Sequence, residues 1–276
     1  MQKPYRHIGP IKNHLAGVLL VAAFLQVITQ PGLANPPGLS NNWYAVNALS
    51  DEFNGERLDA TKWRDLNPTW LGRPPVLFDP ACVAVTKGEL CLTAPKSDGR
   101  TLPKGFTHRC GYIMARSLVR YGYFEIRAKL MDSTLVSCFW LYENTPAEWT
   151  EIDIFEAPAG VPEYRRKLSS NAHVFHSPTY KGDMENHLQH PLLWDAPYDV
   201  SADYHVYGLE WDEKVIRWYV DGALIREQKN TGWHQPLYLC INIEANESLK
   251  ALPDDRRLPG VYRIDYVRTW ERRINK

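Results

Sequence analysis

Short segments of alternating or continuous apolar residues, separated by turn residues, make up most of the chain. Residues 83–86 and 89–93 flank Lys87 and Gly88, a pattern that predicts a hairpin with a tight turn. Residues 121–131 alternate aromatic or charged side chains with Phe, Ile, Ala and Leu, which predicts a half-buried strand, and the nearly all-apolar residues 135–142 predict a buried one. Further strands are predicted at 204–211, 215–220, 223–228, 237–244 and 261–271.

No long segment has the 3.6-residue period of an amphipathic helix. Many short strands with turn signals between them predict an all-β fold, either a sandwich or a jelly roll. Residues 35–42 are rich in Pro, Gly, Ser and Asn, which predicts a flexible linker. We find no internal repeat and no Pro-rich linker after it, so a single domain over residues 43–276 is the simplest organisation.

The first 34 residues have the pattern of a secretory signal. Three basic residues surround the start of the segment, the apolar stretch Leu15–Ile28 follows, and Gly32 and Ala34 are the small residues of a cleavage site. The apolar stretch is short for a membrane-spanning helix. We expect cleavage after Ala34 and a secreted protein, extracellular or periplasmic. An uncleaved membrane anchor is the alternative.

Charge and cysteine usage exclude several classes of protein. Without the signal segment the chain has 29 basic and 32 acidic residues, a net charge of −3, and no basic run. We therefore expect a monomer that binds neither nucleic acid nor a membrane. None of the five cysteines forms a C-x-x-C motif, so a zinc site is not expected. Buried free thiols are favoured over a bridge between Cys82 and Cys91, because diagonal neighbours in a hairpin are about 7–8 Å apart.

The segment Glu151–Glu156, with the sequence EIDIFE, carries the candidate chemistry. In a regular strand Glu151 and Asp153 share one face, whereas Glu156 falls on the other and would be buried in the core at a cost of several kcal/mol. A one-residue β-bulge near Ile154 and Phe155 removes this conflict, because it turns Glu156 onto the face of the other two acids. A solvated acidic edge strand is the alternative.

Three acids on one strand face destabilise a fold but suit glycoside hydrolysis. A retaining glycosidase needs a nucleophilic carboxylate and a protonated one, roughly 5–5.5 Å apart. Mutual repulsion raises the pKa of one glutamate, which keeps it protonated as the acid.

The pattern E-x-D-x-x-E resembles the active-site signature of glycoside hydrolase family 16, in the bulged branch that includes laminarinases, agarases, porphyranases and kappa-carrageenases. Other segments resemble strands of the same family in the same order: residues 51–55, 121–127, 204–211 and 218–222. The resemblance implies a β-jelly roll of two curved antiparallel sheets with an open concave cleft. It also implies that Glu151 is the nucleophile, Asp153 the assisting residue and Glu156 the acid/base.

Aromatic residues near these acids are candidates for sugar binding. Trp149 lies two residues before Glu151 and should share its face, where its ring would stack on a sugar. The resemblance also implies cleft positions for Trp140 and His173. Core packing for the two tryptophans and a structural role for the histidine are the alternatives.

A loop and a late strand add candidates for substrate choice. Trp70 and Arg73 lie three residues apart on one loop, and the resemblance places this loop beside the cleft. A guanidinium group matches the oxygens of a sulfate as it matches those of a phosphate. An ordinary surface loop is the alternative. Asn242 and Glu244 share a strand face, and the resemblance implies that Glu244 reaches sugar hydroxyls.

A structural calcium ion is implied by the resemblance alone, away from the catalytic residues. The matching positions are Asp51, the backbone carbonyl of Gly88, and Asp265, which supply the oxygen ligands that Ca²⁺ prefers. Asp51 in a simple turn is the alternative. Catalysis itself needs no cofactor.

These observations predict a secreted retaining endo-glycosidase that hydrolyses the β-linked galactans of red-algal cell walls, agar or porphyran. A kappa-carrageenase or a laminarinase-like β-1,3-glucanase is the alternative enzyme, and a transglycosylase would share the same covalent intermediate. A lectin-like jelly roll is the alternative outside the enzymes. It is disfavoured because all three catalytic acids are present.

Overall fold

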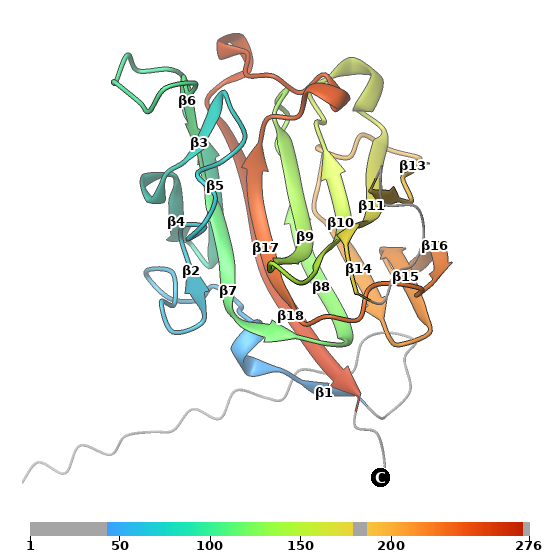
Figure 1. The fold of residues 1–276 in the computed structure, drawn as a ribbon. Coiled ribbons are helices and arrows are strands. Elements are labelled where there is room, and N and C mark those ends of the chain that lie inside the picture. Colours follow the sequence, from blue (N-terminus) through green and yellow to red (C-terminus); the bar gives the residue numbers. More distant parts are fainter. Residues whose placement is uncertain (1–42, 179–186, 273–276) are drawn as a thin grey trace, which may run out of the picture. The chain divides into compact units, whose positions relative to one another are not determined.

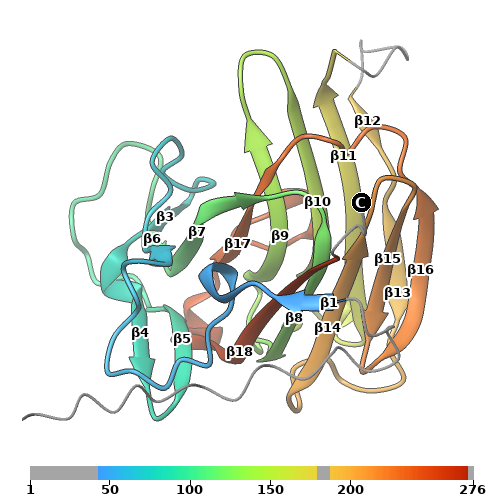
Figure 2. The same cartoon turned by 90° about the horizontal axis from the view of Figure 1, so that it is seen from below.

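The computed structural model describes residues 43–178 and 187–272. Two antiparallel sheets lie face to face as two layers, as the two views show (Figure 1, Figure 2). The predicted signal segment, its cleavage site and the linker lie outside the described residues. Within the described residues, no helix is long and apolar enough to span a membrane.

The first sheet, which we call the back sheet, contains strands from both ends of the domain. Its order is β16 (Ala223–Lys229), β15 (Val215–Val220), β14 (His205–Trp211), β8 (Gly122–Lys129), β18 (Gly260–Arg272), β5 (Glu89–Ala94) and β4 (Val83–Thr86), and β1 (Trp43–Ala45) also pairs with β18.

The second sheet, which we call the front sheet, carries the acidic strand. Its order is β12 (Leu188–Gln189), β11 (Lys167–His176), β10 (Trp149–Ala157), β9 (Val136–Asn144), β17 (Leu237–Glu244), β7 (Tyr112–Val119) and β2 (Trp63–Arg64), and β13 (Leu192–Asp195) pairs with β11.

Shorter elements complete the described fold. A small parallel pair joins β3 (Val76–Phe78) to β6 (His108–Cys110). The helices are single 3₁₀ turns: η1 (Asn47–Leu49), η2 (Pro80–Cys82), η3 (Pro162–Tyr164), η4 (Glu247–Leu249) and η5 (Asp255–Arg257). The predicted all-β jelly-roll class, with its two large sheets, is therefore confirmed.

The hydrophobic core fills the space between the two sheets. Phe124 and Leu209 of the back sheet and Phe139, Leu141 and Ile152 of the front sheet are fully buried in it. The outer face of the back sheet is also partly covered, because Trp43 of β1 packs on Tyr123 with ring centroids 6.3 Å apart. The polar positions of β8 are therefore less exposed than strict alternation suggests.

The predicted hairpin and the predicted free thiols are both present in the structure. Strands β4 and β5 pair around Lys87 and Gly88, whose φ angles of 55° and 78° form the left-handed turn that the glycine favours. All five cysteines are buried and unpaired, as expected: Cys82, Cys91, Cys110, Cys138 and Cys240.

The predicted bulge in β10 is present, and its position is set by pairing with β9. Asp153 lies opposite Trp140 and Glu156 lies opposite Cys138, so three steps along β10 match two steps along β9. Ile154 is the extra residue, between Asp153 and Phe155. Glu156 therefore joins the face of Asp153, as the parity argument requires.

The back sheet supports the strand at this bulge. The indole nitrogen of Trp218, on β15, donates a hydrogen bond of 3.0 Å to the backbone carbonyl of Asp153. Trp218 is fully buried, so this bond links the two layers directly beneath the acidic strand.

We expect Trp218→Phe to destabilise the fold more than Trp270→Phe does. Both residues are buried and both changes remove the same volume, but the indole nitrogen of Trp270 has no partner among the described residues. Loss of the bond to Asp153 should add about 1 kcal/mol to the destabilisation, the net contribution of a typical intramolecular hydrogen bond. Urea denaturation of the two variants measures the difference, and equal losses would show that the bond does not anchor the bulge.

Candidate active site

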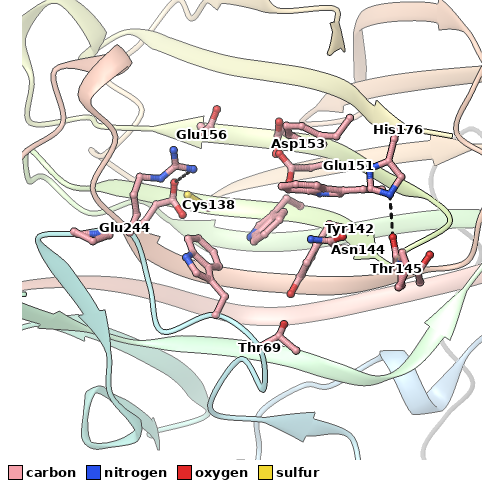
Figure 3. Close-up of a pocket in the computed structure, with 17 residues that line it drawn as sticks. Thr69, Cys138, Tyr142, Asn144, Thr145, Glu151, Asp153, Glu156, His176 and Glu244 are labelled. Atoms are coloured by element: carbon pink, nitrogen blue, oxygen red, sulfur yellow. Dashed lines mark hydrogen bonds and ion pairs between the residues drawn. The ribbon is translucent and has the colours of Figure 1, made fainter. Parts of the chain in front are cut away.

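A cleft of about 820 Å³ lies on the outer face of the front sheet. Strand β10 and its neighbour β9 form its floor, and the loop before β3 and the end of β17 form one side (Figure 3). Its lining includes all of the predicted catalytic and sugar-binding residues except His173: Trp70, Arg73, Trp140, Trp149, Glu151, Asp153, Glu156 and Glu244.

The three acids of β10 point into this cleft side by side (Figure 3). Opposite them on β9, Tyr142, Trp140 and Cys138 occupy every second position and so share the same face. The sequence prediction that the three carboxylates face one cleft is therefore confirmed.

His173 joins this group from β11, where it pairs with Glu151. Its Nε2 atom lies 3.2 Å from Asp153 Oδ2 and 3.8 Å from Glu151 Oε1. The ring thus bridges the predicted nucleophile and the predicted assisting residue. His173 itself is not among the residues that line the cleft, so its role stays a prediction.

Glu156 has different neighbours. Asn246, just beyond β17, donates a hydrogen bond of 3.0 Å to Glu156 Oε1. The carboxylates of Glu156 and Glu244 and the thiol of Cys138 lie within 4.8 Å of one another. Glu156 therefore lies close to Glu244 on β17 as well as to the other two acids of β10.

Burial and mutual repulsion act together on these carboxylates. Burial, followed by repulsion from Asp153 and then Glu156, raises the pKa of Glu151 well above its usual range. Burial, followed by repulsion from Asp153 and Glu244, raises the pKa of Glu156 to about 8. The pair therefore retains a proton at neutral pH, which general acid catalysis requires.

The backbone beneath the acids is fixed by a second buried tryptophan. The indole nitrogen of Trp233 donates to the carbonyl oxygens of Glu151, at 3.0 Å, and His173, at 2.9 Å. Because these two residues pair across β10 and β11, one donor aligns both strands under the catalytic face.

The aromatic candidates line the cleft but also pack on one another. Trp140 stacks on Tyr142, with ring centroids 4.5 Å apart, and its indole nitrogen donates to Asn242. Trp70 meets Trp140 edge to face at 6.2 Å. Trp149 stacks on Phe175 at 4.0 Å. Each ring therefore has both a cleft position and a packing role, so the two interpretations made from the sequence are not exclusive.

Arg73 and Glu244, which the sequence suggested separately, form an ion pair. Arg73 Nη2 lies 3.1 Å from Glu244 Oε1, and the side chain of Arg73 is 50% exposed while that of Glu244 is only 5% exposed. Burial raises the pKa of Glu244 to about 7, although Arg73 opposes the shift. The cation therefore lines the acidic cleft from an exposed loop.

Sequence reasoning missed several residues of the site: Asn246, Cys138, Tyr142, Phe175 and His176. The β9 residues could have been found from their alternation opposite β10, once the pairing of the two strands was assumed. Asn246 follows the segment that includes Glu244, but nothing local to the sequence indicates its bond to Glu156.

The predicted calcium ligands are already engaged with other groups. The Asp51 carboxylate accepts hydrogen bonds from the Phe53 amide, at 2.9 Å, and from the Trp63 indole, at 3.0 Å. Asp265 pairs with Arg127 at 2.7 Å. A cation would compete with these donors, so the residues fit calcium poorly here, and the site remains a prediction from the resemblance.

Two groups of side chains in the cleft have the chemistry to hold a metal ion: Cys138 with Glu156 and Glu244, and Glu151 with Asp153 and His173. Each group includes one of the predicted catalytic glutamates. A metal bound there would occupy the carboxylate that has to react, and hydrolysis by two carboxylates needs no metal.

Comparison with known proteins agrees with this geometry. A family model described as the GH16 domain of beta-porphyranases A–D matches residues 43–272. The chain belongs to glycoside hydrolase family 16. It is therefore an enzyme that hydrolyses O-glycosidic bonds, and its substrate is a polysaccharide.

Individual members of family 16 are similar to it over most of their length. The beta-porphyranase E of Zobellia galactanivorans is 31% identical and aligns over 83% of this chain and 88% of its own. The beta-porphyranase B of Phocaeicola plebeius is 28% identical, over 76% and 78% respectively. The crystal structure of porphyranase B from Zobellia galactanivorans superposes with a TM-score of 0.74 at 23% identity, over 86% of this chain and 97% of that one, and so confirms the fold.

We expect Glu156→Gln to make this family 16 enzyme more stable at neutral pH. The folded-state pKa of Glu156 is about 8, above its ordinary value of 4.5, so the folded state holds a proton that the unfolded state has released. Stability should therefore fall as the pH rises from about 4.5 to 8, and the variant should avoid ~1–3 kcal/mol of this loss, since the cleft remains open to water.

Thermal or urea unfolding between pH 4 and pH 8 measures this effect. The matched control is Glu213→Gln, which changes an exposed glutamate and should follow the wild type at every pH. A Glu156→Gln variant whose stability falls with pH as steeply as that of the wild type would contradict a shifted pKa.

Proposed function

We propose that this protein is a retaining endo-hydrolase of β-linked galactans, acting on agar or porphyran, with a preference for sulfated chains. The observation that carries the proposal is the placement of Arg73 and Trp70 on one side of the cleft that holds Glu151, Asp153 and Glu156. The similarity to beta-porphyranases over most of the chain supports the same class of substrate.

In the first step, Glu156 donates its proton to the glycosidic oxygen while a carboxylate oxygen of Glu151 attacks the anomeric carbon. The glycosidic bond breaks, and a covalent glycosyl-enzyme forms. In the second step Glu156 takes a proton from water, whose oxygen attacks the same carbon and releases Glu151. Two inversions leave the configuration unchanged.

The neighbours of the two glutamates fit these roles. Asp153 and His173 lie beside Glu151, where His173 can orient its carboxylate and Asp153 resists further negative charge near it. Glu156 instead accepts a hydrogen bond from the neutral Asn246 amide, and burial raises its pKa to about 8, as burial also raises the pKa of Glu151. The two glutamates therefore have different surroundings, as two different roles require.

The cleft also accounts for binding a polymer. It is open and is lined by Trp70, Trp140 and Trp149, whose rings offer apolar faces to sugar rings. An open cleft admits internal segments of a chain, which favours endo-cleavage. The signal-like first 34 residues fit a role outside the cytoplasm, where such polymers occur.

The alternative enzymes differ in what Arg73 would meet. Kappa-carrageenan is also sulfated, so the cation alone does not distinguish it from porphyran. A neutral β-1,3-glucan gains nothing from a cation in the cleft. We favour porphyran or agar because of the Trp70–Arg73 loop together with Glu244 and Asn242 on β17.

The test of the proposed function is hydrolysis of four polymers: porphyran, agarose, kappa-carrageenan and laminarin. We expect shorter oligosaccharides from porphyran or agarose, with retention seen by proton NMR early in the reaction. Glu151→Gln and Glu156→Gln should each lose most of the activity while keeping the fold. With Glu151→Gly, azide should give a product of inverted configuration, because it replaces the missing nucleophile in a single displacement.

If only laminarin yields products, the protein is a β-1,3-glucanase and the proposed function is wrong. Near wild-type turnover by either glutamine variant would show that the role assigned to that residue is wrong.

We expect Arg73→Ala to weaken turnover of sulfated porphyran about tenfold to a hundredfold and to change turnover of agarose little. The reason is the loss of a charge-assisted contact to sulfate, ~1.5–3 kcal/mol when it is partly shielded from water. Measurement of kcat/KM on both polymers checks this, and added salt should narrow the gap by screening. Equal losses on both substrates would mean that Arg73 only shapes the loop.

A further inference from the structure

The ion pair between Arg73 and Glu244 places a negative charge directly behind the cation that would meet a sulfate. Arg73 Nη2 lies 3.1 Å from Glu244 Oε1. Half of the Arg73 side chain is exposed, and the residue lines the cleft, so part of its fork of donors can reach a ligand.

Glu244 is held firmly in this position. It is buried at the end of β17, and the Asn242 side chain, two residues earlier on the same face, donates to Glu244 Oε2 at 3.4 Å. Among the described residues, Arg73 is the cation with which Glu244 forms an ion pair. A sulfate bound to Arg73 would therefore feel both the attraction of the guanidinium and the repulsion of a fixed carboxylate close behind it.

We propose that Glu244 is a specificity-determining residue: its carboxylate orients Arg73, and its negative charge limits how strongly Arg73 attracts a sulfate on the substrate. This inference rests on the proposed galactanase function. With this pair, the cleft would bind sulfated sugar units without binding them so strongly that neutral units are excluded. Cleavage of a polymer that contains both kinds of unit requires this.

The two members of the pair should therefore have opposite effects on selectivity. Removal of Arg73 removes the attraction. Replacement of Glu244 by glutamine keeps an oxygen that can accept from Arg73, and so keeps its orientation, but removes the repulsion. If the ion pair only stabilised the fold, Arg73→Ala and Glu244→Gln would change the porphyran-to-agarose ratio in the same direction.

Protonation of Glu244 should act in the same way as the glutamine. The pKa of Glu244, raised by burial, is about 7, so the residue becomes neutral as the pH falls through that value. Several titratable or charged groups face it from the surrounding elements: Arg73, Cys110, Cys138, Glu151, Asp153 and Glu156. The catalytic acids among them affect turnover of both substrates, and Glu151 and Glu156 also act on Arg73, so comparison with Glu244→Gln separates the part of the pH dependence that belongs to Glu244.

The experiment compares kcat/KM on porphyran and on agarose for the wild type, Glu244→Gln and Arg73→Ala. We expect the porphyran-to-agarose ratio to rise about three- to tenfold in Glu244→Gln, and to fall in Arg73→Ala. In the wild type this ratio should also rise as the pH falls from 8 to 6, and it should rise less in Glu244→Gln. Glu143→Gln, which removes a charge from β9 outside the cleft lining, is the matched control and should leave the ratio unchanged.

A second probe does not need any hydrolysis. Inorganic sulfate, compared with chloride at equal ionic strength, should raise the unfolding temperature of Glu244→Gln more than that of the wild type, and should have no specific effect on Arg73→Ala. A ratio that is unchanged or lowered in Glu244→Gln, or equal sulfate effects in all three proteins, would overturn the inference. A wild type that hydrolyses no galactan, yet shows the predicted sulfate effects, would overturn the proposed function instead.

Discussion

The crowding of carboxylates on one face of β10 is the constraint on which the rest of this structure depends. A regular strand would separate Glu151 from Glu156 by the thickness of the sheet, and only the extra residue at Ile154 brings them together. Three acids on such a surface repel one another, and burial makes the repulsion stronger. The fold tolerates them because the cluster retains protons, as the raised pKa values of Glu151 and Glu156 show, and because Arg73 lies nearby.

The buried layer behind the strand keeps this arrangement in register. At the bulge the ladder between β9 and β10 is interrupted, and the Asp153 carbonyl takes its hydrogen bond from the Trp218 indole of the opposite sheet. The indole nitrogen of Trp233 likewise donates to the carbonyl oxygens of Glu151 and His173. Each tryptophan fills core volume and also supplies one donor, so the same two residues contribute to the packing of the sandwich and hold the backbone that carries the cleft carboxylates.

How much the sequence predicts follows from how local each feature is. The bulge could be deduced within six residues, because strand parity and the cost of burying Glu156 leave few solutions. The hairpin at Lys87 and Gly88 is equally local. The bond from Asn246 to Glu156 joins residues 90 positions apart, and the pairing of Arg73 with Glu244 joins two segments whose contact no periodicity reveals. The calcium site implied by the resemblance stays a prediction, and its Asp51 and Asp265 contact Trp63 and Arg127, partners that the matched positions alone do not indicate.

The proposed reaction depends on residues that are close together in the sequence, whereas the proposed choice of substrate depends on residues from distant segments. The chemistry needs two carboxylates with unlike surroundings, and one bulged strand with its neighbours supplies them. In the proposed function, recognition of a sulfated sugar depends on the charge that Arg73 presents to the cleft. That charge is set jointly by a loop before β3, by Glu244 on β17 and by the proton held near Glu156 on β10. A substitution in any one of these segments changes the balance without touching the catalytic strand. Members of one family can therefore keep the reaction constant while the polymer they cleave differs.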